Sequence, residues 1–390
     1  MTRFEKTILS ITGGSHLSVH ALMLALPSLI PVIRNEFSVG LDTLGFVVTV
    51  SAFMFGLGAI PAGWAEKRFG GRQLLLIYQS GSSISALLVA LSGSFQMMVV
   101  SLGLMGFFCS IYHPAGLTLI SHRVKSLTRG MAIHGIFGST GSAAGPLLAT
   151  TLAAIISWRS AYAFLSVFNG ILAISTFFAI PYRKRSNIPE EEFANHEEAT
   201  NKPALILYFL TNAFMGMAYY GFTTFMPVHF AENTNATLPN LSANMKAGIF
   251  PTMVFIAGVG GQLVGARIGE RFRKTTALIF IIFANIPLLI LMGYTTDIFL
   301  IISSLLLGVA YFSNQPIGNT LIARFTHSQN RGLSYGISFF LSFGIGSFAA
   351  GFSGLIAENM GVAAVFPAMG ILLIPSVVFA FFMRRAAVRS

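Results

Sequence analysis

The sequence predicts an all-α membrane protein whose twelve transmembrane helices form two six-helix bundles. First, 54% of its residues are hydrophobic and only 9% are charged, whereas a soluble domain carries about 25% charged residues. Second, the apolar stretches are continuous and about twenty residues long, which is the length of a helix that crosses a bilayer. Third, one long polar segment divides them into two sets of six. Barrel strands would alternate apolar and polar residues, so we expect helices, which satisfy their own backbone hydrogen bonds.

The polar segment lies between the sixth and the seventh expected helix. It covers residues 181–202 and carries a basic cluster and then five glutamates, which is typical of a solvated linker. We therefore expect an N-terminal bundle at 1–181, a cytoplasmic linker at 182–203 and a C-terminal bundle at 204–390. The helices are expected at residues 8–33, 43–65, 73–92, 95–120, 130–155, 160–180, 204–230, 245–266, 275–293, 297–323, 332–357 and 362–383.

Basic residues are distributed unevenly between the two sets of loops. Of the 24 lysines and arginines, all but Arg34, Arg159 and Lys246 fall on one side. Cytoplasmic loops carry the excess of Lys and Arg, so we expect both termini in the cytoplasm and a multi-pass protein of the plasma membrane, in particular of a bacterial inner membrane. Orientation and contact with anionic lipids also account for the net charge of +11, so no nucleic-acid partner is expected.

Two loops at corresponding places in the two halves resemble each other. The loop after the second helix reads GWAEKRFGGR at 63–72, and the loop after the eighth helix reads GARIGERFRK at 265–274. Both combine small residues at a helix end with an acid, then Arg-Phe and further cations. An internal repeat of this kind is typical of secondary transporters.

With these features, the sequence resembles the major facilitator superfamily of transporters over essentially its whole length. The loop at 63–72 is similar to the family signature Gly-x-x-x-Asp-Arg-x-Gly-Arg, except that Lys67 takes the place of the acid and Glu66 lies one residue early. In the family, this acid caps a helix end and pairs with cations across the two halves, which latches one conformation. A tight charged turn without that role is the alternative. The resemblance implies gating roles for Gly63, Glu66, Arg68, Gly70, Arg72, Glu270 and Arg271.

The expected helix at 130–155 also carries the resemblance. Its stretch GIFGSTGSAAGPLL, at 135–148, is similar to the family's helix-5 signature of antiporters, with Ala149 and Thr150 in place of two later glycines. The resemblance favours efflux and implies a gating role for Gly145 and Pro146. The small residues also allow a second helix to approach closely, which would explain them without any role in export.

Histidines are the ionisable residues inside the expected spans, because every Asp and Glu falls in a loop or near a helix end. His16 and His20 are four residues apart and share one helix face. His113 lies in the triplet at 112–114, Tyr-His-Pro, which resembles the fosmidomycin-resistance-like branch of the family. Ionisable residues in a membrane mostly face a cavity or a partner, and histidine titrates near neutral pH. We expect contacts with protons or substrate, and structural hydrogen bonds are the alternative.

The second half supplies polar, uncharged side chains in the spans at 204–230 and 297–323. The family resemblance implies that the first, fourth, seventh and tenth helices line a central cavity, and the most polar faces fall on these four. Hydrogen bonding between helices is the alternative. Because the histidines have no carboxylate or thiolate beside them, no metal site is expected. The expected substrate- and proton-binding residues are His16, His20, Tyr112, His113, His134, Asn212, Tyr219, Tyr220, Tyr311, Asn314, Gln315 and Asn319.

The energy source is expected to be a gradient, because the sequence contains no glycine-rich phosphate loop followed by Lys-Ser/Thr. We predict a monomeric secondary transporter that works by alternating access, with no cofactor and no enzymatic activity. It is expected to export a small amphipathic or weakly anionic compound with the proton as coupling ion. Two alternatives stay open: uptake of a nutrient, organic acid or metal chelate by symport or facilitated diffusion, and a receptor or assembly subunit that moves no solute.

Overall fold

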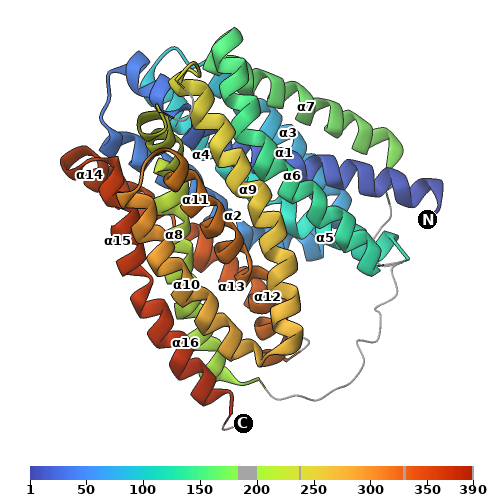
Figure 1. The fold of residues 1–390 in the computed structure, drawn as a ribbon. Helices are drawn as coiled ribbons and strands as arrows, with labels where there is room; N and C mark the ends of the chain where they lie inside the picture. Colours follow the sequence, from blue (N-terminus) through green and yellow to red (C-terminus); the bar gives the residue numbers. More distant parts are fainter. Residues whose placement is uncertain (126, 183–199, 237–238, 328–330, 389–390) are drawn as a thin grey trace.

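A computed structural model describes residues 1–390 except 126, 183–199, 237–238, 328–330 and 389–390. Every regular element in this described part is helical (Figure 1), which confirms the all-α class. Most of the expected linker at 182–203 lies outside the described residues. The helices of the first half are α1 (Arg3–Phe37), α2 (Leu41–Phe69), α3 (Gly71–Ala90), α4 (Phe95–Ser110), α5 (Tyr112–Arg123), α6 (Leu127–Ile155) and α7 (Trp158–Ala179).

The second half begins after the linker and contains a larger number of short elements. These are α8 (Lys202–Asn233), α9 (Ala243–Arg271), α10 (Lys274–Tyr294), α11 (Asp297–Phe312), α12 (Asn314–Phe325), α13 (Arg331–Phe339), the π-helical η3 (Phe340–Ile345), α14 (Phe348–Met360), the 3₁₀ turn η4 (Val362–Ala364), α15 (Val365–Leu372) and α16 (Ile374–Ala386).

The expected spans at 95–120, 297–323, 332–357 and 362–383 correspond to four of the stretches that are long and apolar enough to cross a membrane. Each of them contains a local break in its helix. The breaks at Ile111 and Ser313 each precede a proline by three residues, Pro114 and Pro316. A proline has no N–H to give to the carbonyl four residues earlier, and its ring clashes with that carbonyl. The same cause applies at Leu373, because Pro375 follows it. The break near 340–345 is instead a π-helical turn, a feature that is frequent at functional sites.

The described residues contain eleven helical stretches that are long and apolar enough to cross a membrane. Large apolar side chains on their outer faces are exposed, as Phe178, Phe280 and Tyr294 illustrate, and a lipid environment explains such a surface. The expected helix at 130–155 corresponds to α6, which has 29 residues but is not one of the eleven. The number of twelve spans, like the cytoplasmic position of the termini, stays a prediction.

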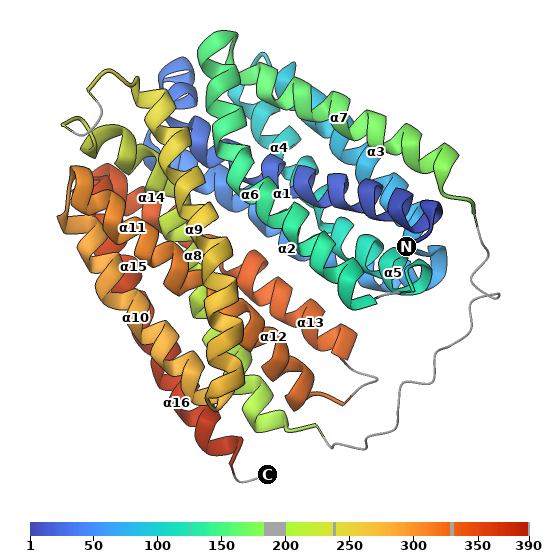
Figure 2. The same ribbon diagram turned by 45° about the vertical axis from the view of Figure 1, so that its right-hand side comes forward.

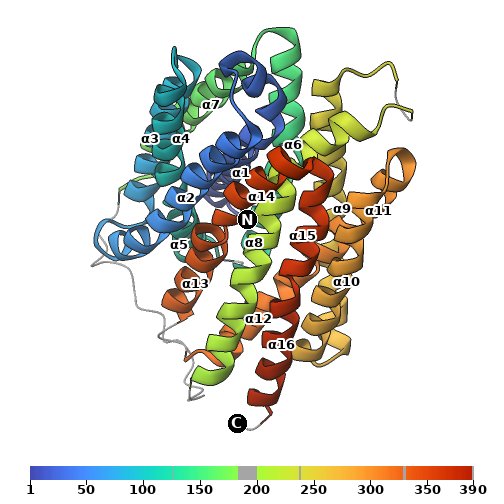
Figure 3. The same cartoon turned by 90° about the vertical axis from the view of Figure 1, so that its left-hand side faces the viewer.

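The helices form two groups, α1–α7 and α8–α16, which meet toward the end of α1 that is opposite to the N-terminus. In Figures 1 and 2 the groups spread apart toward the two chain termini. Figure 3 shows α14 of the second group lying close to α1 and α2 of the first. We call the region where α2 packs on η3 and α14, and α6 packs on α9, the far-end contact.

Small residues and hydroxyl groups build the far-end contact. Gly56 of α2 lies so close to Gly344 of η3 that a Cβ atom on Gly56 would overlap the glycine backbone. Thr49 Oγ1 donates to the carbonyl of Ser347 at 2.8 Å and accepts from the N–H of Gly351 at 3.0 Å. The two groups therefore touch backbone to backbone here, which bulky side chains would prevent.

Candidate functional site

Four histidines and one tyrosine gather where α1, α5 and α6 meet, and we call them the histidine cluster: His16, His20, Tyr112, His113 and His134. The rings of His16 and His134 are stacked with centroids 3.9 Å apart, and His16 lies 4.9 Å from His20 and 5.2 Å from His113. His16, Tyr112 and His134 are buried, whereas His20 and His113 are half-buried. The structure thus brings all five of these expected site residues together.

Glycines of α6 allow α1 to approach closely enough to form this cluster. Gly141 and Gly145 lie against the backbone of α1 at Leu17 and Ala21, and a Cβ atom on Gly138 would overlap the His16 ring. The stretch at 135–148 therefore has a structural function in this protein, whatever its part in gating. Close contact of small residues between helices is a common basis of packing in membranes.

Replacing Gly138 with alanine is therefore expected to disturb the cluster. The new methyl group would meet the buried imidazole of His16, which two hydrogen bonds hold in place. Overpacking of this kind costs about 1–3 kcal/mol, so the melting temperature of the purified protein should fall. Gly135→Ala is the matched control, because a Cβ atom on Gly135 has no neighbour within 4 Å. Equal melting temperatures for the two variants would contradict the expectation.

A chain of hydrogen bonds determines which nitrogen atoms carry protons in the neutral cluster. The Tyr112 hydroxyl donates to the Thr12 carbonyl at 2.6 Å, so it accepts from His134 Nδ1–H at 3.1 Å. His16 Nδ1–H donates to the His134 carbonyl at 2.8 Å, because a carbonyl can only accept. His16 Nε2 is then an acceptor, and His20 Nε2–H donates to it at 3.1 Å. The chain ends at His20, which is half-buried.

His113 joins the cluster to the second half of the protein. Its ring stacks on Phe339 of α13 with centroids 5.4 Å apart and meets Phe55 of α2 edge to face at 6.2 Å. Phe339 in turn stacks on Phe343 of η3 at 5.5 Å. The ionisable groups therefore lie against an aromatic wall that the other group of helices supplies.

The tyrosines expected in the cavity also lie together. Tyr219 and Tyr311 are stacked with centroids 5.6 Å apart, and Tyr219 meets Tyr220 at 5.5 Å. Tyr220 lies 6.2 Å from Phe343, so this group continues the aromatic wall that begins beside His113. The Tyr311 hydroxyl donates to the carbonyl of Met215, which attaches α11 to α8.

The amide side chains of the second half divide into two kinds. Asn212 donates to the carbonyl and the hydroxyl of Ser338, and Asn314 donates to the carbonyl of Tyr311. These contacts are the hydrogen bonds within and between helices that we weighed as the alternative to cavity lining. Gln315 and Asn319 are exposed on α12, so their side chains remain accessible to a solute.

The expected gating residues near the end of α2 hold local contacts. Arg72 donates to the carbonyls of Phe177 and Ile180 and so ties α3 to α7 within the first half. The Gly70 N–H donates to the Glu66 carbonyl at 2.8 Å, and Gly70 has a φ of 78°, a conformation that favours glycine. Arg68 lies over the ring of Phe69, whereas Gly63, Glu270 and Arg271 are exposed at the helix ends, and Gly145 and Pro146 lie inside α6.

Polar side chains also join the two groups of helices at the far end, and the sequence did not predict these contacts. Arg34 Nη2 lies 3.8 Å from Glu358 Oε2, and the same oxygen accepts from the Leu41 N–H at 2.7 Å. Glu358 thereby connects α14 to the start of α2 and the end of α1. No sequence signal pointed to this pairing, because the partners are more than 300 residues apart and each occupies an ordinary place at a helix end.

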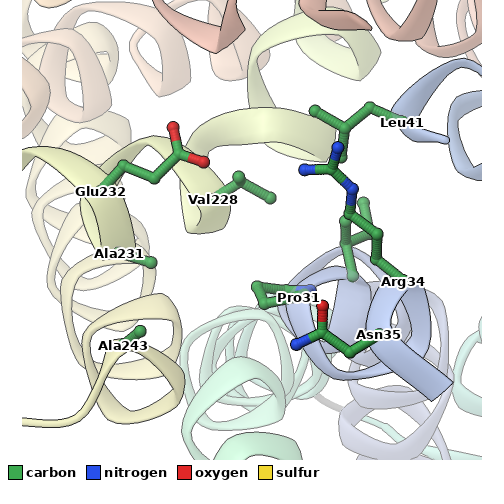
Figure 4. A pocket seen from close by; sticks show the side chains of 9 residues that line it. Pro31, Arg34, Asn35, Leu41, Val228, Ala231, Glu232 and Ala243 are labelled. Carbon is green, nitrogen blue, oxygen red and sulfur yellow. The ribbon is translucent and has the colours of Figure 1, made fainter. Parts of the chain in front are cut away.

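A pocket of about 210 Å³ lies between the two groups of helices at this end. Figure 4 shows Glu232 on one side of it and Arg34 and Asn35 on the other. Arg34 is fourteen residues beyond His20 on α1, which is about 20 Å along the helix, so the pocket is separate from the histidine cluster. Its lining residues are Ile30, Pro31, Arg34, Asn35, Leu41, Val228, Ala231, Glu232 and Ala243.

Two groups of helices that are long and apolar enough to cross a membrane define the class of polytopic membrane proteins. The model of the Major Facilitator Superfamily matches residues 12–351 and 233–390, so the chain belongs to this superfamily. The predicted resemblance is confirmed. Membership also supports the expectation that the chain is a membrane transporter and not an enzyme.

Known proteins are similar to this chain over two thirds of its length or more. The fosmidomycin resistance protein of Escherichia coli (strain K12) is 22% identical over 391 residues, which are 94% of this chain and 92% of the relative. The cis,cis-muconate transport protein of Acinetobacter baylyi is 23% identical over 294 residues, which are 67% and 69% of the two chains. A solved structure of a bacterial homologue of the human lysosomal transporter Spinster, inward-facing and occupied, superposes with a TM-score of 0.79 at 16% identity and covers 99% of this chain and 98% of its own.

Proposed function

We propose that this protein is a secondary active transporter that exports a small amphipathic or weakly anionic compound, with protons as the coupling ion. The observation that carries the proposal is the histidine cluster of the first group of helices, which contacts the second group through His113. His16 and His20 are linked by a hydrogen bond, and His113 stacks on Phe339 from the other group. Histidine is the side chain whose charge changes most readily near neutral pH. If binding of the solute changes the surroundings of these histidines, it changes their affinity for protons, and solute movement is then coupled to proton movement.

The aromatic wall supports an amphipathic substrate. Phe339, Phe343 and Tyr220 form a continuous apolar surface next to the imidazoles of the cluster. A compound with an apolar body and a weakly acidic group would pack against the rings and place its acidic group beside His20 or His113. Gln315 and Asn319 add accessible amide groups, and the tyrosines Tyr219 and Tyr311 complete the proposed lining.

The proposed transport mechanism is that of the superfamily. The bundles at 1–181 and 204–390 rock about the site, and the loops at 63–72 and 265–274, with Gly145 and Pro146, take part in gating. We propose that this conformation is open toward the side of the termini, which is the cytoplasm of a bacterial inner membrane. The far-end contact supports that assignment, as does the likeness to a homologue solved in an inward-facing state. One chain supplies both bundles, so the transporter works as a monomer.

Export is supported by the glycines of α6 and by the fosmidomycin resistance protein among the relatives. Uptake of an organic acid is the second candidate function, because other relatives are a cis,cis-muconate transport protein and a probable sulfoacetate transporter of Cupriavidus necator. The sulfoacetate transporter is 22% identical over 63% of this chain and 60% of its own length. Both candidates use the same site and differ in the direction of net flux.

The test uses proteoliposomes that contain the purified protein and a trapped pH-sensitive dye. Addition of fosmidomycin or cis,cis-muconate is expected to move protons across the membrane, and an imposed pH gradient is expected to drive solute movement. His20→Ala loses the hydrogen bond to His16, and His113→Ala loses the ring contact with Phe339. Each variant should reduce both signals at least about tenfold, because each removes one imidazole of the proposed proton site. His122→Ala, at an exposed position in the last turn of α5, is the control.

The outcomes separate the parts of the proposal. Solute movement that ignores the pH gradient would rule out proton coupling. Normal transport by both His20→Ala and His113→Ala would rule out the assignment of the site. A deletion strain that loses growth on an organic acid, and does not become more drug-sensitive, would favour uptake.

A further inference from the structure

The ring nitrogens of His16, His20 and His113 all lie within 4.8 Å of one another. We propose that these three side chains bind one first-row transition-metal ion of the Zn²⁺ or Co²⁺ type and leave a fourth position for water or a small anion. The sequence led us to expect no metal, because no carboxylate or thiolate accompanies the histidines. Three imidazoles are nevertheless a sufficient protein ligand set for a four-coordinate zinc ion whose fourth ligand is exchangeable.

The spacing of His16 and His20 suits such an ion. They occupy positions i and i+4 of α1, the separation at which two histidines on one helix face hold zinc in known sites. Their Nε2 atoms are 3.1 Å apart, and two nitrogen ligands of a tetrahedral zinc ion, each at about 2.05 Å from it, are separated by about 3.3 Å. To chelate a metal through both Nε2 atoms, His20 must move its ring proton from Nε2 to Nδ1, whereas the positions of the two rings need little change.

The third ligand, His113, has to come closer. Its ring nitrogen lies no more than 4.8 Å from those of the other two, so a shift of about 1.5 Å brings it to ligand spacing. His113 is half-buried and held by ring contacts with Phe339 and Phe55. A small rotation of this side chain is enough, and it does not require any movement of the helices.

A hydrogen bond from His16 to the backbone provides the orientation that metal ligands commonly have. His16 Nδ1–H donates to the carbonyl of His134 at 2.8 Å, which places the lone pair of His16 on Nε2, toward His20. Metal-binding histidines usually donate their other ring N–H to a carbonyl or carboxylate, and this contact fixes the tautomer and the ring orientation. The ring of His134 stacks on the ring of His16 and is itself hydrogen-bonded to Tyr112, which further restrains the orientation of His16.

The test is a titration of the purified full-length protein in detergent with Co²⁺, whose visible d–d absorption reports tetrahedral nitrogen coordination. The protein must carry an affinity tag without histidines. One equivalent of Co²⁺ is expected to bind, and Zn²⁺ is expected to displace it and abolish the absorption. His16→Ala, His20→Ala and His113→Ala should each weaken binding at least about tenfold. His122→Ala, at an exposed position on α5, should bind Co²⁺ as the unchanged protein does.

The proposal is overturned if Co²⁺ gives no saturable tetrahedral spectrum, or if His20→Ala and His113→Ala bind it unchanged. Those two positions are half-buried and decide the matter even if His16→Ala fails to fold. The measurement involves no flux, so metal binding and the proposed transport activity succeed or fail independently.

Discussion

Replacement of Gly56 by leucine is expected to lower transport by about ten- to a hundredfold while the protein still inserts and folds. Gly56 lies against the backbone of Gly344 at the far-end contact, and a side chain there would overlap main-chain atoms that have no rotamer with which to yield. Overpacking costs about 1–3 kcal/mol, and here the cost falls on the conformation in which the two groups of helices touch. The population should move toward conformations that are open at the far end.

The shift can be measured by labelling a cysteine introduced at Ala231, which lines the pocket at that end. The native Cys109 is buried, so its background reaction with an impermeant maleimide should be small. The label should react faster with the protein that also carries Gly56→Leu. Gly135→Leu is the matched control, since a Cβ atom on Gly135 has no neighbour within 4 Å. Unchanged labelling and unchanged transport in Gly56→Leu would show that the far-end contact does not close the transporter.

Replacement of His16 by leucine is expected to abolish transport that is driven by a pH gradient. His16 is the central member of the histidine cluster, because it donates to the His134 carbonyl and accepts from His20. Leucine removes both hydrogen bonds and leaves the His20 Nε2–H without its acceptor, at a cost of about 1–3 kcal/mol. The proton pathway that we propose would also lose its connection between α1 and α6.

Loss of stability alone would not explain the expected pattern. Exchange of labelled for unlabelled solute requires no net proton movement, so His16→Leu should retain exchange better than gradient-driven transport. His229→Leu is the control: His229 is buried and bonded to the Met292 carbonyl in the second half, and its loss should reduce stability without uncoupling solute from protons. Equal losses of exchange and of driven transport in His16→Leu would contradict a role in coupling.

Much of the fold could be read from local properties of the sequence. Continuous apolar stretches fixed the class, and the spacing of four residues placed His16 and His20 on one face, as the hydrogen bond between them confirms. The glycines at 135–148 predicted a close helix partner, which is α1. These properties depend on neighbours a few residues away, so a single sequence contains them.

Contacts between residues that are far apart in the sequence could not be predicted in the same way. Nothing in the sequence connects Arg34 with Glu358, or Thr49 with Ser347, because their proximity arises only when the two groups of helices pack. Pro114 and Pro316 can break a helix, but the sequence alone does not determine whether they do, since membrane helices often tolerate a proline when neighbours satisfy the released carbonyl. Asn212 and Asn314 were expected in the cavity, but the packing of the helices decides which groups they bond, and the sequence does not show that packing.

The paired breaks at Ile111 and Ser313 have a mechanical consequence. Each separates a terminal stub of twelve residues, α5 and α12, from the long segment that precedes it. Both joints keep helical dihedral angles but lack the hydrogen bond that the proline cannot donate, so we expect each stub to bend more easily than an unbroken helix. Closure on the side of the termini would then add the swing of two short levers, one from each half, to the rocking of the bundles. His113 is at the base of one lever and Gln315 at the base of the other, so a solute held between them would meet both moving parts at once.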